Sequence, residues 1–211
     1  MRRALVGTSG WSYPTWRPAF YPAGARTDEL LGLYAGRLPA VELNATGYRL
    51  PAAEQFRRWA EQVPTGFRFA VKAPRLVLRS PAVVAERVRE LGDRLGCVRL
   101  VVESARDDAL LERLLSGFAG TRLALDLRDG SWDGVETLLG DDAVRVGDMD
   151  AQAGWRYVRF RDPPYDRQAL EAFANRLRPL VESGVDVFGF FRHEDEPTAP
   201  KAALELLALL R

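Results

Sequence analysis

Short apolar runs that end in polar residues recur along the chain. Glu42 and Asn44 close one such run, and Ser9, Lys72 and Asp126 lie at the ends of others. Each run has the length and composition of a buried strand, so polar side chains are expected at several strand ends. Parallel strands present their carboxyl ends on the same side of a sheet. We therefore expect these side chains to converge on the mouth of a barrel.

Segments with helical spacing of apolar residues alternate with these runs, bounded by capping residues, proline and glycine. We expect strands at residues 4–7, 41–44, 67–71, 97–102, 122–127, 143–146, 156–160 and 185–190. We expect helices at residues 27–38, 51–63, 80–95, 107–118, 132–139, 166–182 and 200–210.

Eight strands alternating with about seven helices predict a small, irregular α/β barrel of the TIM (β/α)8 type. The linker between the sixth and seventh strands has roughly eight residues, too few for a helical crossover, so one helix is expected to be missing there. We expect residues 1–211 to form a single domain. A doubly wound open sheet is the alternative, but the chain lacks the glycine-rich phosphate-binding motifs typical of such folds.

Composition indicates a soluble protein without disulfides. Cys97 and His193 are the single cysteine and the single histidine, which leaves no framework for a disulfide or a Cys/His zinc site. No apolar run approaches the length of a membrane span, so we expect a cytoplasmic protein with no membrane partner. The net charge of +1 provides no overall field that would attract nucleic acid.

The segment after the first strand is rich in aromatic residues. Trp11, Tyr13, Trp16, Phe20 and Tyr21 occur there among three prolines. They form either a hydrophobic plug or a floor on which a sugar ring or base could stack. Because so many aromatic side chains would otherwise form a large exposed apolar patch, we expect them to pack over the barrel mouth.

Three motifs resemble those of the YecE-like family, also known as domain of unknown function 72. They are Gly7-Thr-Ser-Gly-Trp-Ser-Tyr13, Val41-Glu-Leu-Asn44 with Tyr48-Arg-Leu-Pro51, and Phe69-Ala-Val-Lys-Ala73 with Arg75. The similarity is specific to about residue 75 and collinear to the end. It implies an irregular TIM-type barrel, remotely similar to xylose isomerase and endonuclease IV, with no settled activity.

The chain departs from the family pattern where histidines are usual. Asp129, Arg161-Asp162 and Leu78-Arg79 stand where members usually carry histidine, and His193-Glu194 replaces the usual Asn-Asp. These departures indicate a divergent member. A protein with no surviving activity is one interpretation of them.

Candidate site residues lie at the expected strand ends. Glu42 and Asp126 are the acid–base candidates, with Lys72 beside them; the alternative is a structural ion-pair layer of both carboxylates against Lys72 and Arg128. For Lys72 we favour a role as partner of Glu42 or of an anionic ligand over Schiff-base chemistry. Candidate ligand-binding residues are Ser9, Trp11, Tyr13, Asn44, Tyr48, Arg75, Arg128, Trp132, Arg159, Arg161 and His193.

The spacing leaves two questions open. Arg159 and Arg161 point to the same side of the seventh strand, either inward or outward. Glu42, Asp126, Asp148 and His193 could hold Mg²⁺ or Mn²⁺, although we favour a site without metal. The sequence identifies no cofactor and no oligomeric state.

Lys72, Arg75 and Arg128 outnumber Glu42 and Asp126 by one charge, and this excess favours an anion at the mouth. We therefore expect a site for an anionic small molecule or nucleotide-type ligand, with hydrolysis and isomerisation as the candidate reactions. The alternative is a noncatalytic binder of single-stranded nucleic acid that uses the aromatic segment and the arginines.

Overall fold

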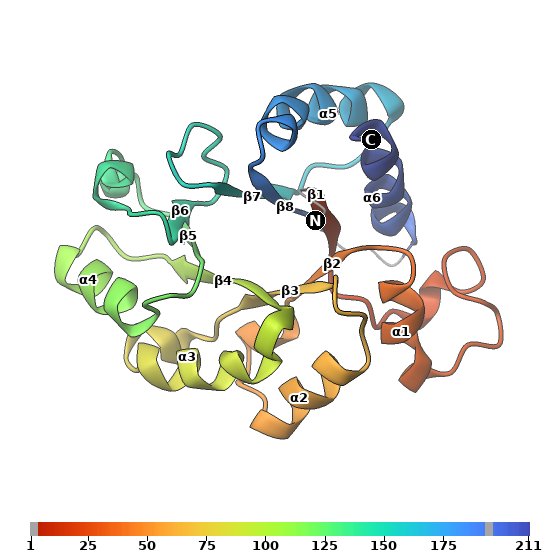
Figure 1. Cartoon of the computed structure of the whole chain (residues 1–211), viewed down its shortest axis with the longest axis horizontal. Coiled ribbons are helices and arrows are strands. Elements are labelled where there is room, and N and C mark those ends of the chain that lie inside the picture. Colours follow the sequence, from red (N-terminus) through yellow and green to blue (C-terminus); the bar gives the residue numbers. More distant parts are fainter. Residues whose placement is uncertain (1–3, 193–195) are drawn as a thin grey trace.

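A computed structural model describes residues 4–192 and 196–211 of the chain. Eight parallel strands form one sheet in the order β6-β5-β4-β3-β2-β1-β8-β7 and curve into a barrel (Figure 1). The predicted TIM-type architecture is confirmed. The strands are β1 Ala4–Ser9, β2 Ala40–Leu43, β3 Arg68–Lys72, β4 Leu95–Val102, β5 Leu123–Leu127, β6 Ala143–Arg145, β7 Trp155–Phe160 and β8 Asp186–Phe191.

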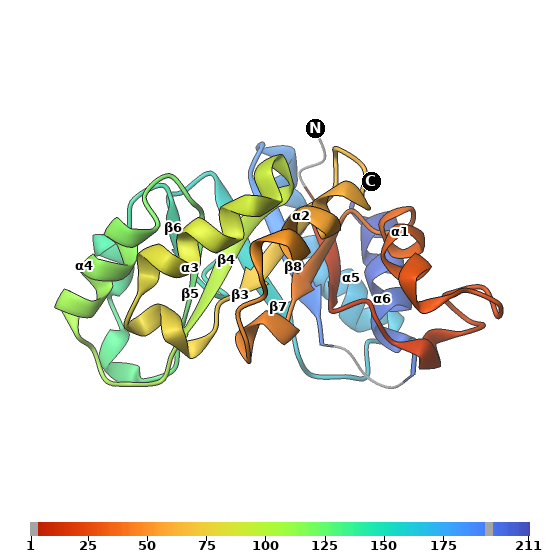
Figure 2. The same cartoon turned by 90° about the horizontal axis from the view of Figure 1, so that it is seen from below.

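Six α-helices cover the outside of the barrel, and Figure 2 shows α1 to α4 following one another across its outer surface. None of the helices in the described residues is long and apolar enough to cross a membrane. The helices are α1 Leu30–Ala35, α2 Ala53–Glu61, α3 Pro81–Val88, α4 Asp108–Gly117, α5 Arg167–Glu182 and α6 Thr198–Leu209.

The segment between β5 and β6 differs from the prediction. Instead of one helix it contains two 3₁₀ turns, Gly130–Trp132 and Val135–Leu138, separated by Gly134 at φ 81°. This left-handed backbone conformation interrupts any continuous right-handed helix, and glycine adopts it at little cost. The apolar spacing alone did not reveal the break.

The barrel is nearly closed. β6 and β7 are the two ends of the sheet order, and the turn that follows β6 contacts β7 through a hydrogen bond from Gly147 N–H to the Tyr157 carbonyl at 2.9 Å. The segment between these strands contains no helix, in agreement with its predicted shortness. A three-residue β6 offers few backbone partners to β7.

Arg156 stabilises this helix-free linker from within. Its guanidinium donates to the carbonyl of Met149 at 2.9 Å and to that of Ala153 at 2.6 Å, and it also bonds the Ala151 carbonyl. A buried backbone carbonyl without a partner is costly, so this one cation satisfies groups that a crossover helix would satisfy itself.

The barrel interior combines small and large side chains. Ala40, Ala70, Cys97 and Ala124 on β2 to β5 belong to one buried cluster with aromatic residues of β7 and β8. Those aromatic residues are Trp155, Tyr157, Phe188 and Phe190. Small residues on one side leave the volume that the aromatic rings fill, so the lumen is packed and Cys97 is a core residue.

The contact between β1 and β2 aligns the first part of the site. A Cβ atom on Gly7 would lie 1.8 Å from the Ala40 carbonyl oxygen, so only glycine fits. The Tyr34 hydroxyl accepts the Thr8 N–H at 2.9 Å and donates to the Ala40 carbonyl at 3.0 Å. This register places Ser9 opposite Glu42 at the carboxyl ends of the two strands.

Candidate functional site

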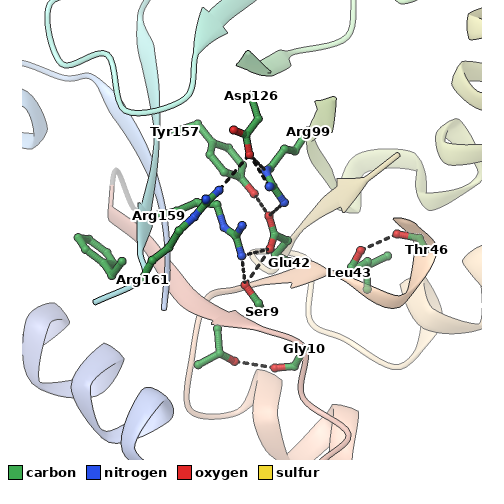
Figure 3. A network of polar contacts seen from close by, with 12 residues as sticks. Ser9, Gly10, Glu42, Leu43, Thr46, Arg99, Asp126, Tyr157, Arg159 and Arg161 are labelled. Carbon is green, nitrogen blue, oxygen red and sulfur yellow. Dashed lines mark hydrogen bonds and ion pairs between the residues drawn. The ribbon is translucent and has the colours of Figure 1, made fainter. Parts of the chain in front are cut away.

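Glu42 lies at the centre of a buried polar network at the carboxyl end of the barrel (Figure 3). Ser9 Oγ donates to its Oε1 at 2.7 Å, and the Tyr157 hydroxyl donates to its Oε2. Arg159 lies 3.2 Å from Oε1 and Arg99 lies 3.3 Å from Oε2. Both carboxylate oxygens of Glu42 are therefore fully engaged by groups from other strands.

Asp126 is the second carboxylate of the network and is surrounded by arginines. Arg99 Nε donates to its Oδ2 at 2.9 Å. Arg128 Nε lies 2.9 Å from Oδ1, and Arg161 Nη2 lies 3.0 Å from Oδ2. Since Arg99 also contacts Glu42, its guanidinium bridges the two carboxylates. The planar fork of arginine suits such a double contact.

Strand alternation explains why these side chains meet. Lys72 lies opposite Arg99 in the β3–β4 register, so both point to the same face of the sheet. Tyr157, Arg159 and Arg161 follow at alternate positions, and all three reach Glu42 or Asp126. The open question about β7 is thereby answered, because the structure turns Arg159 and Arg161 inward.

Both carboxylates remain ionised in the folded protein. Burial opposes ionisation of Glu42, but the positive charges of Arg159 and Arg99 outweigh it and hold the pKa of Glu42 below its usual value. Burial likewise opposes ionisation of Asp126, and Arg99 is the main group that lowers the pKa of this carboxyl. Burial and the Glu42 charge raise the pKa of Tyr157 well above its ordinary range, so it stays a hydrogen-bond donor.

Lys72 makes no hydrogen bond or ion pair through its amine with any residue that the structure describes. Its Nζ lies 5.2 Å from the centre of the Tyr48 ring. The suggested pairing of Glu42 with Lys72 is therefore wrong, because Arg99 and Arg159 already occupy the Glu42 oxygens. Burial and the charge of Arg99 lower the pKa of Lys72.

Among the residues that the structure describes, the charges of this cluster do not cancel. Glu42 and Asp126 face five cationic side chains there, which leaves three positive charges in excess. These cations are Lys72, Arg99, Arg128, Arg159 and Arg161. The Nε atom of Arg159 is buried and finds no hydrogen-bond acceptor among the described residues.

Some candidate residues have structural contacts. Trp132 is buried and its indole N–H donates to the Ser104 carbonyl at 2.9 Å. Arg75 is highly exposed and pairs with Glu103, which is also exposed. Asp148 accepts the backbone N–H of Asp150 at 2.8 Å within the β6–β7 linker. These side chains are engaged away from Glu42 and Asp126.

Asn44 and Tyr48 flank a short 3₁₀ turn, Ala45–Gly47, that follows β2. Asn44 is half-buried at the start of the turn, whereas Tyr48 is 82% exposed. Tyr48 thus offers an open aromatic face beside the cationic cluster. His193 lies outside the described residues.

The aromatic segment after β1 does not cover the mouth as expected. Trp16, Phe20 and Tyr21 are buried and belong to the core outside the barrel, where the ring of Phe20 lies 6.0 Å from that of Tyr34 in α1. The apolar face of α1 and the outer side of β1 provide the partners that these rings need. The hydrophobic-plug interpretation describes them better than a stacking floor.

Two members of the segment lie elsewhere. Trp11 packs edge-on against Trp59 of α2 at 5.6 Å. Tyr13 donates its hydroxyl to the Ser9 carbonyl at 3.0 Å, next to the network. Burial and the charge of Glu42 raise the pKa of Tyr13 to about 12. Tyr13 is thus the aromatic residue of this segment that contacts the polar site.

The metal-site alternative is not supported by the described part of the chain. No group of three or more His, Cys, Asp or Glu side chains there could hold a metal ion. Arginines fill the space between Glu42 and Asp126 instead, so oxygen atoms of the two carboxylates are not free to converge on a cation.

Sequence reasoning missed Arg99 and Tyr157. Arg99 interrupts an otherwise apolar strand, and a buried charge of this kind requires an ionic partner, so the signal was present in the sequence. Tyr157 carried no comparable signal, because a tyrosine in a strand is common in ordinary cores.

Arg99→Met should destabilise the protein by about 3 kcal/mol, because it removes one partner from a buried network of opposite charges. Urea unfolding at neutral pH measures this loss. Arg75→Met is the matched control, since its exposed ion pair should contribute less than about 1 kcal/mol. Equal losses in the two variants would show that the buried network does not depend on Arg99.

The stability contributed by Glu42 should depend on pH in the acid range. Its pKa is lower in the folded than in the unfolded protein, so the contribution is complete above the unfolded value of about 4.3. It is lost as pH falls through the folded value. We therefore expect the free energy of unfolding to fall more steeply between about pH 5 and pH 3 in the wild type than in Glu42→Gln.

Chemical denaturation across this pH range measures the two slopes. Glu103→Gln, which alters an exposed carboxylate, should keep the wild-type slope. A Glu42→Gln variant with an unchanged slope would show that Glu42 has the same pKa in both states.

Comparison with known proteins relates this architecture to one family. The sequence pattern described as "Protein of unknown function DUF72" matches residues 5–211. The UPF0759 protein YunF of Bacillus subtilis (strain 168) is 31% identical over 68 residues, a match that covers 32% of this chain and 23% of that protein.

Two solved structures share the fold at low sequence identity. A DUF72 family protein from Thermotoga maritima MSB8 superimposes with a TM-score of 0.80 at 20% identity, covering 98% of both chains. One from Enterococcus faecalis V583 gives a TM-score of 0.76 at 15% identity, covering 100% of this chain and 98% of that one. The irregular barrel and the matched sequence pattern thus agree with the motifs of the first three strands, and the chain belongs to the DUF72 family.

Proposed function

We propose that this protein is a cytoplasmic, single-domain barrel that binds a small anionic ligand at the carboxyl end of its strands. The excess of three positive charges around Glu42 and Asp126 carries this proposal. Like charges at such short range repel one another, and an anion would relieve that repulsion.

The arrangement of the cations suits a phosphate or carboxylate group. Arg128 and Arg161 approach Asp126 from the solvent side and are 41% and 33% exposed, so their remaining N–H groups are accessible. Lys72 has no anionic partner in the described chain, and planar guanidinium groups bind oxyanions through two parallel hydrogen bonds. The ligand class is therefore a phosphorylated or carboxylated small molecule.

Acid–base catalysis by Glu42 and Asp126 remains a prediction with less support. Catalytic acid and base pairs usually have pKa values displaced in opposite directions, whereas both of these carboxyls have lowered pKa values. Hydrolysis or isomerisation would thus need a further proton donor.

Single-stranded nucleic acid is a weaker candidate ligand. Stacking of successive bases needs several exposed aromatic side chains, but Trp16, Phe20 and Tyr21 are buried. Tyr48 could stack one ring beside the cations, which favours a single nucleotide-type ligand over a strand.

Phosphate should raise the melting temperature of the wild type by mass action. With a Kd of about 1 mM, about 10 mM phosphate stabilises the folded state by roughly 1.4 kcal/mol, or about 3–5 °C. Lys72→Met should lose most of this rise and still fold, because the Lys72 amine has no partner in the described chain. Thermal unfolding at constant ionic strength provides the measurement.

The matched control is Lys201→Met, which alters an exposed lysine on α6. This variant should retain the full phosphate-dependent rise. Identical rises in the wild type and in Lys72→Met would place the anion elsewhere on the protein and overturn the proposed site.

A further inference from the structure

The stem of Lys72 is held by packing, while its amine makes no hydrogen bond or ion pair with any residue that the structure describes. Thr46 Oγ1 donates to the Lys72 carbonyl at 2.8 Å, which fastens the turn after β2 to the end of β3. The same hydroxyl also donates to the Leu43 carbonyl (Figure 3). A Cβ atom on Gly47 would lie 2.7 Å from Lys72 Cδ, so the stem packs directly beneath this glycine. The amine is thus positioned by packing and not by a carboxylate.

The surroundings of the amine disfavour its charged form. Burial acts first, and the positive charges of Arg99 and Arg159 add to it, while Glu42 and Asp126 act in the opposite direction. The net result is a lowered pKa for Lys72. Burial and neighbouring cations both increase the fraction of the neutral, nucleophilic amine, while the remaining fraction stays cationic.

The composition of the chain adds an independent observation. Of its 30 basic residues only Lys72 and Lys201 are lysines, so arginine is used almost everywhere else. An arginine at position 72 would supply a permanent cation but no nucleophilic amine, because guanidinium groups do not lose a proton in proteins. Lysine adds one capability that arginine lacks, which is a lone pair on nitrogen.

We propose that Lys72 forms an imine with the carbonyl carbon of an anionic substrate, a step that rests on the proposed anion site. The substrate class is a carbonyl compound that carries a carboxylate or phosphate group. Arg128 and Arg161 bind that anionic group, and the carbonyl carbon lies against Lys72 Nζ. Tyr48 borders the amine on its exposed side.

The step balances without a cofactor. The neutral amine attacks the carbonyl carbon, a carbon–nitrogen bond forms, and the carbonyl oxygen leaves as water with both hydrogens of the amine. No electron acceptor or donor takes part. The resulting imine, once protonated, withdraws electrons from the neighbouring carbon, which is the usual advantage of covalent catalysis by lysine.

Reductive trapping tests the proposal on the full chain. The protein is incubated at neutral pH with sodium cyanoborohydride and either pyruvate or dihydroxyacetone phosphate, which distinguish a carboxylate from a phosphate, and the labelled peptides are identified by mass spectrometry. We expect at least one probe to label Lys72 faster than Lys201, because burial and the neighbouring cations lower the pKa of Lys72 and so enlarge the fraction of its neutral amine. Neutral acetone should show a much smaller preference for Lys72.

Two variants separate this proposal from simple anion binding. Lys72→Arg keeps the cation, so it should lose the label but retain the phosphate-dependent rise in melting temperature. Lys201→Arg should retain both. Equal labelling of the two lysines in the wild type overturns the proposal.

If phosphate still raises the melting temperature but neither probe labels Lys72, the lysine is only an anion ligand. Acetone could instead label Lys72 with the same preference as the charged probes, while phosphate leaves the melting temperature unchanged. That result would show a reactive lysine and would overturn the proposal that its substrate is anionic.

Discussion

A guanidinium buried inside a barrel requires negatively charged partners, and Arg99 on β4 is such a group. The arrangement of the charged side chains at the barrel mouth depends on how this requirement is met. Removing such a charge from water costs several kcal/mol unless ion pairs and hydrogen bonds offset it. Glu42 and Asp126 supply the compensation from β2 and β5. The two carboxylates in turn need donors of their own, which come from β1 and β7. Side chains of β1, β2, β5 and β7 are therefore coupled through Arg99 on β4.

The same constraint explains the excess of positive charge. Each carboxylate has several oxygen lone pairs to satisfy, and arginines satisfy them on Asp126 while Ser9 and Tyr157 share the task on Glu42. The cationic side chains that donate hydrogen bonds thus outnumber the carboxylates that accept them. Arg161 belongs to this set, and its guanidinium adds a permanent positive charge beside Asp126.

The architecture was predictable because it depends on local patterns. Apolar runs located all eight strands to within a few residues, and the length of the linker after β6 indicated the missing helix. Strand ends also indicated that Glu42 and Asp126 would lie at the same end of the barrel, since parallel strands point their carboxyl ends in one direction, whereas the direction of Arg159 and Arg161 stayed open. The interruption of the expected helix at Gly134 was not predicted, because a glycine within an apolar pattern does not by itself indicate a left-handed backbone conformation.

The sequence alone did not predict which cationic side chains pair with Glu42 and Asp126. Several cations compete for Glu42, and the outcome depends on which side chains the strand register brings within reach. Arg99 occupies the position between Glu42 and Asp126, so Lys72 pairs with neither of these carboxylates. That difference between a paired and an unpaired lysine changes the chemistry expected of the site, and only the three-dimensional arrangement reveals it.

A crystal structure of the protein soaked with tungstate would show where a phosphate-like anion binds, because tungsten scatters anomalously. We expect an anomalous peak at the barrel mouth, within hydrogen-bond distance of Lys72 Nζ and of Arg128 or Arg161. The opposite end of the barrel offers a comparison, because Arg68, Arg89, Arg94 and Arg122 line a cavity of about 690 Å³ there. A peak in that cavity with none at the mouth would contradict an anion site built around Arg99.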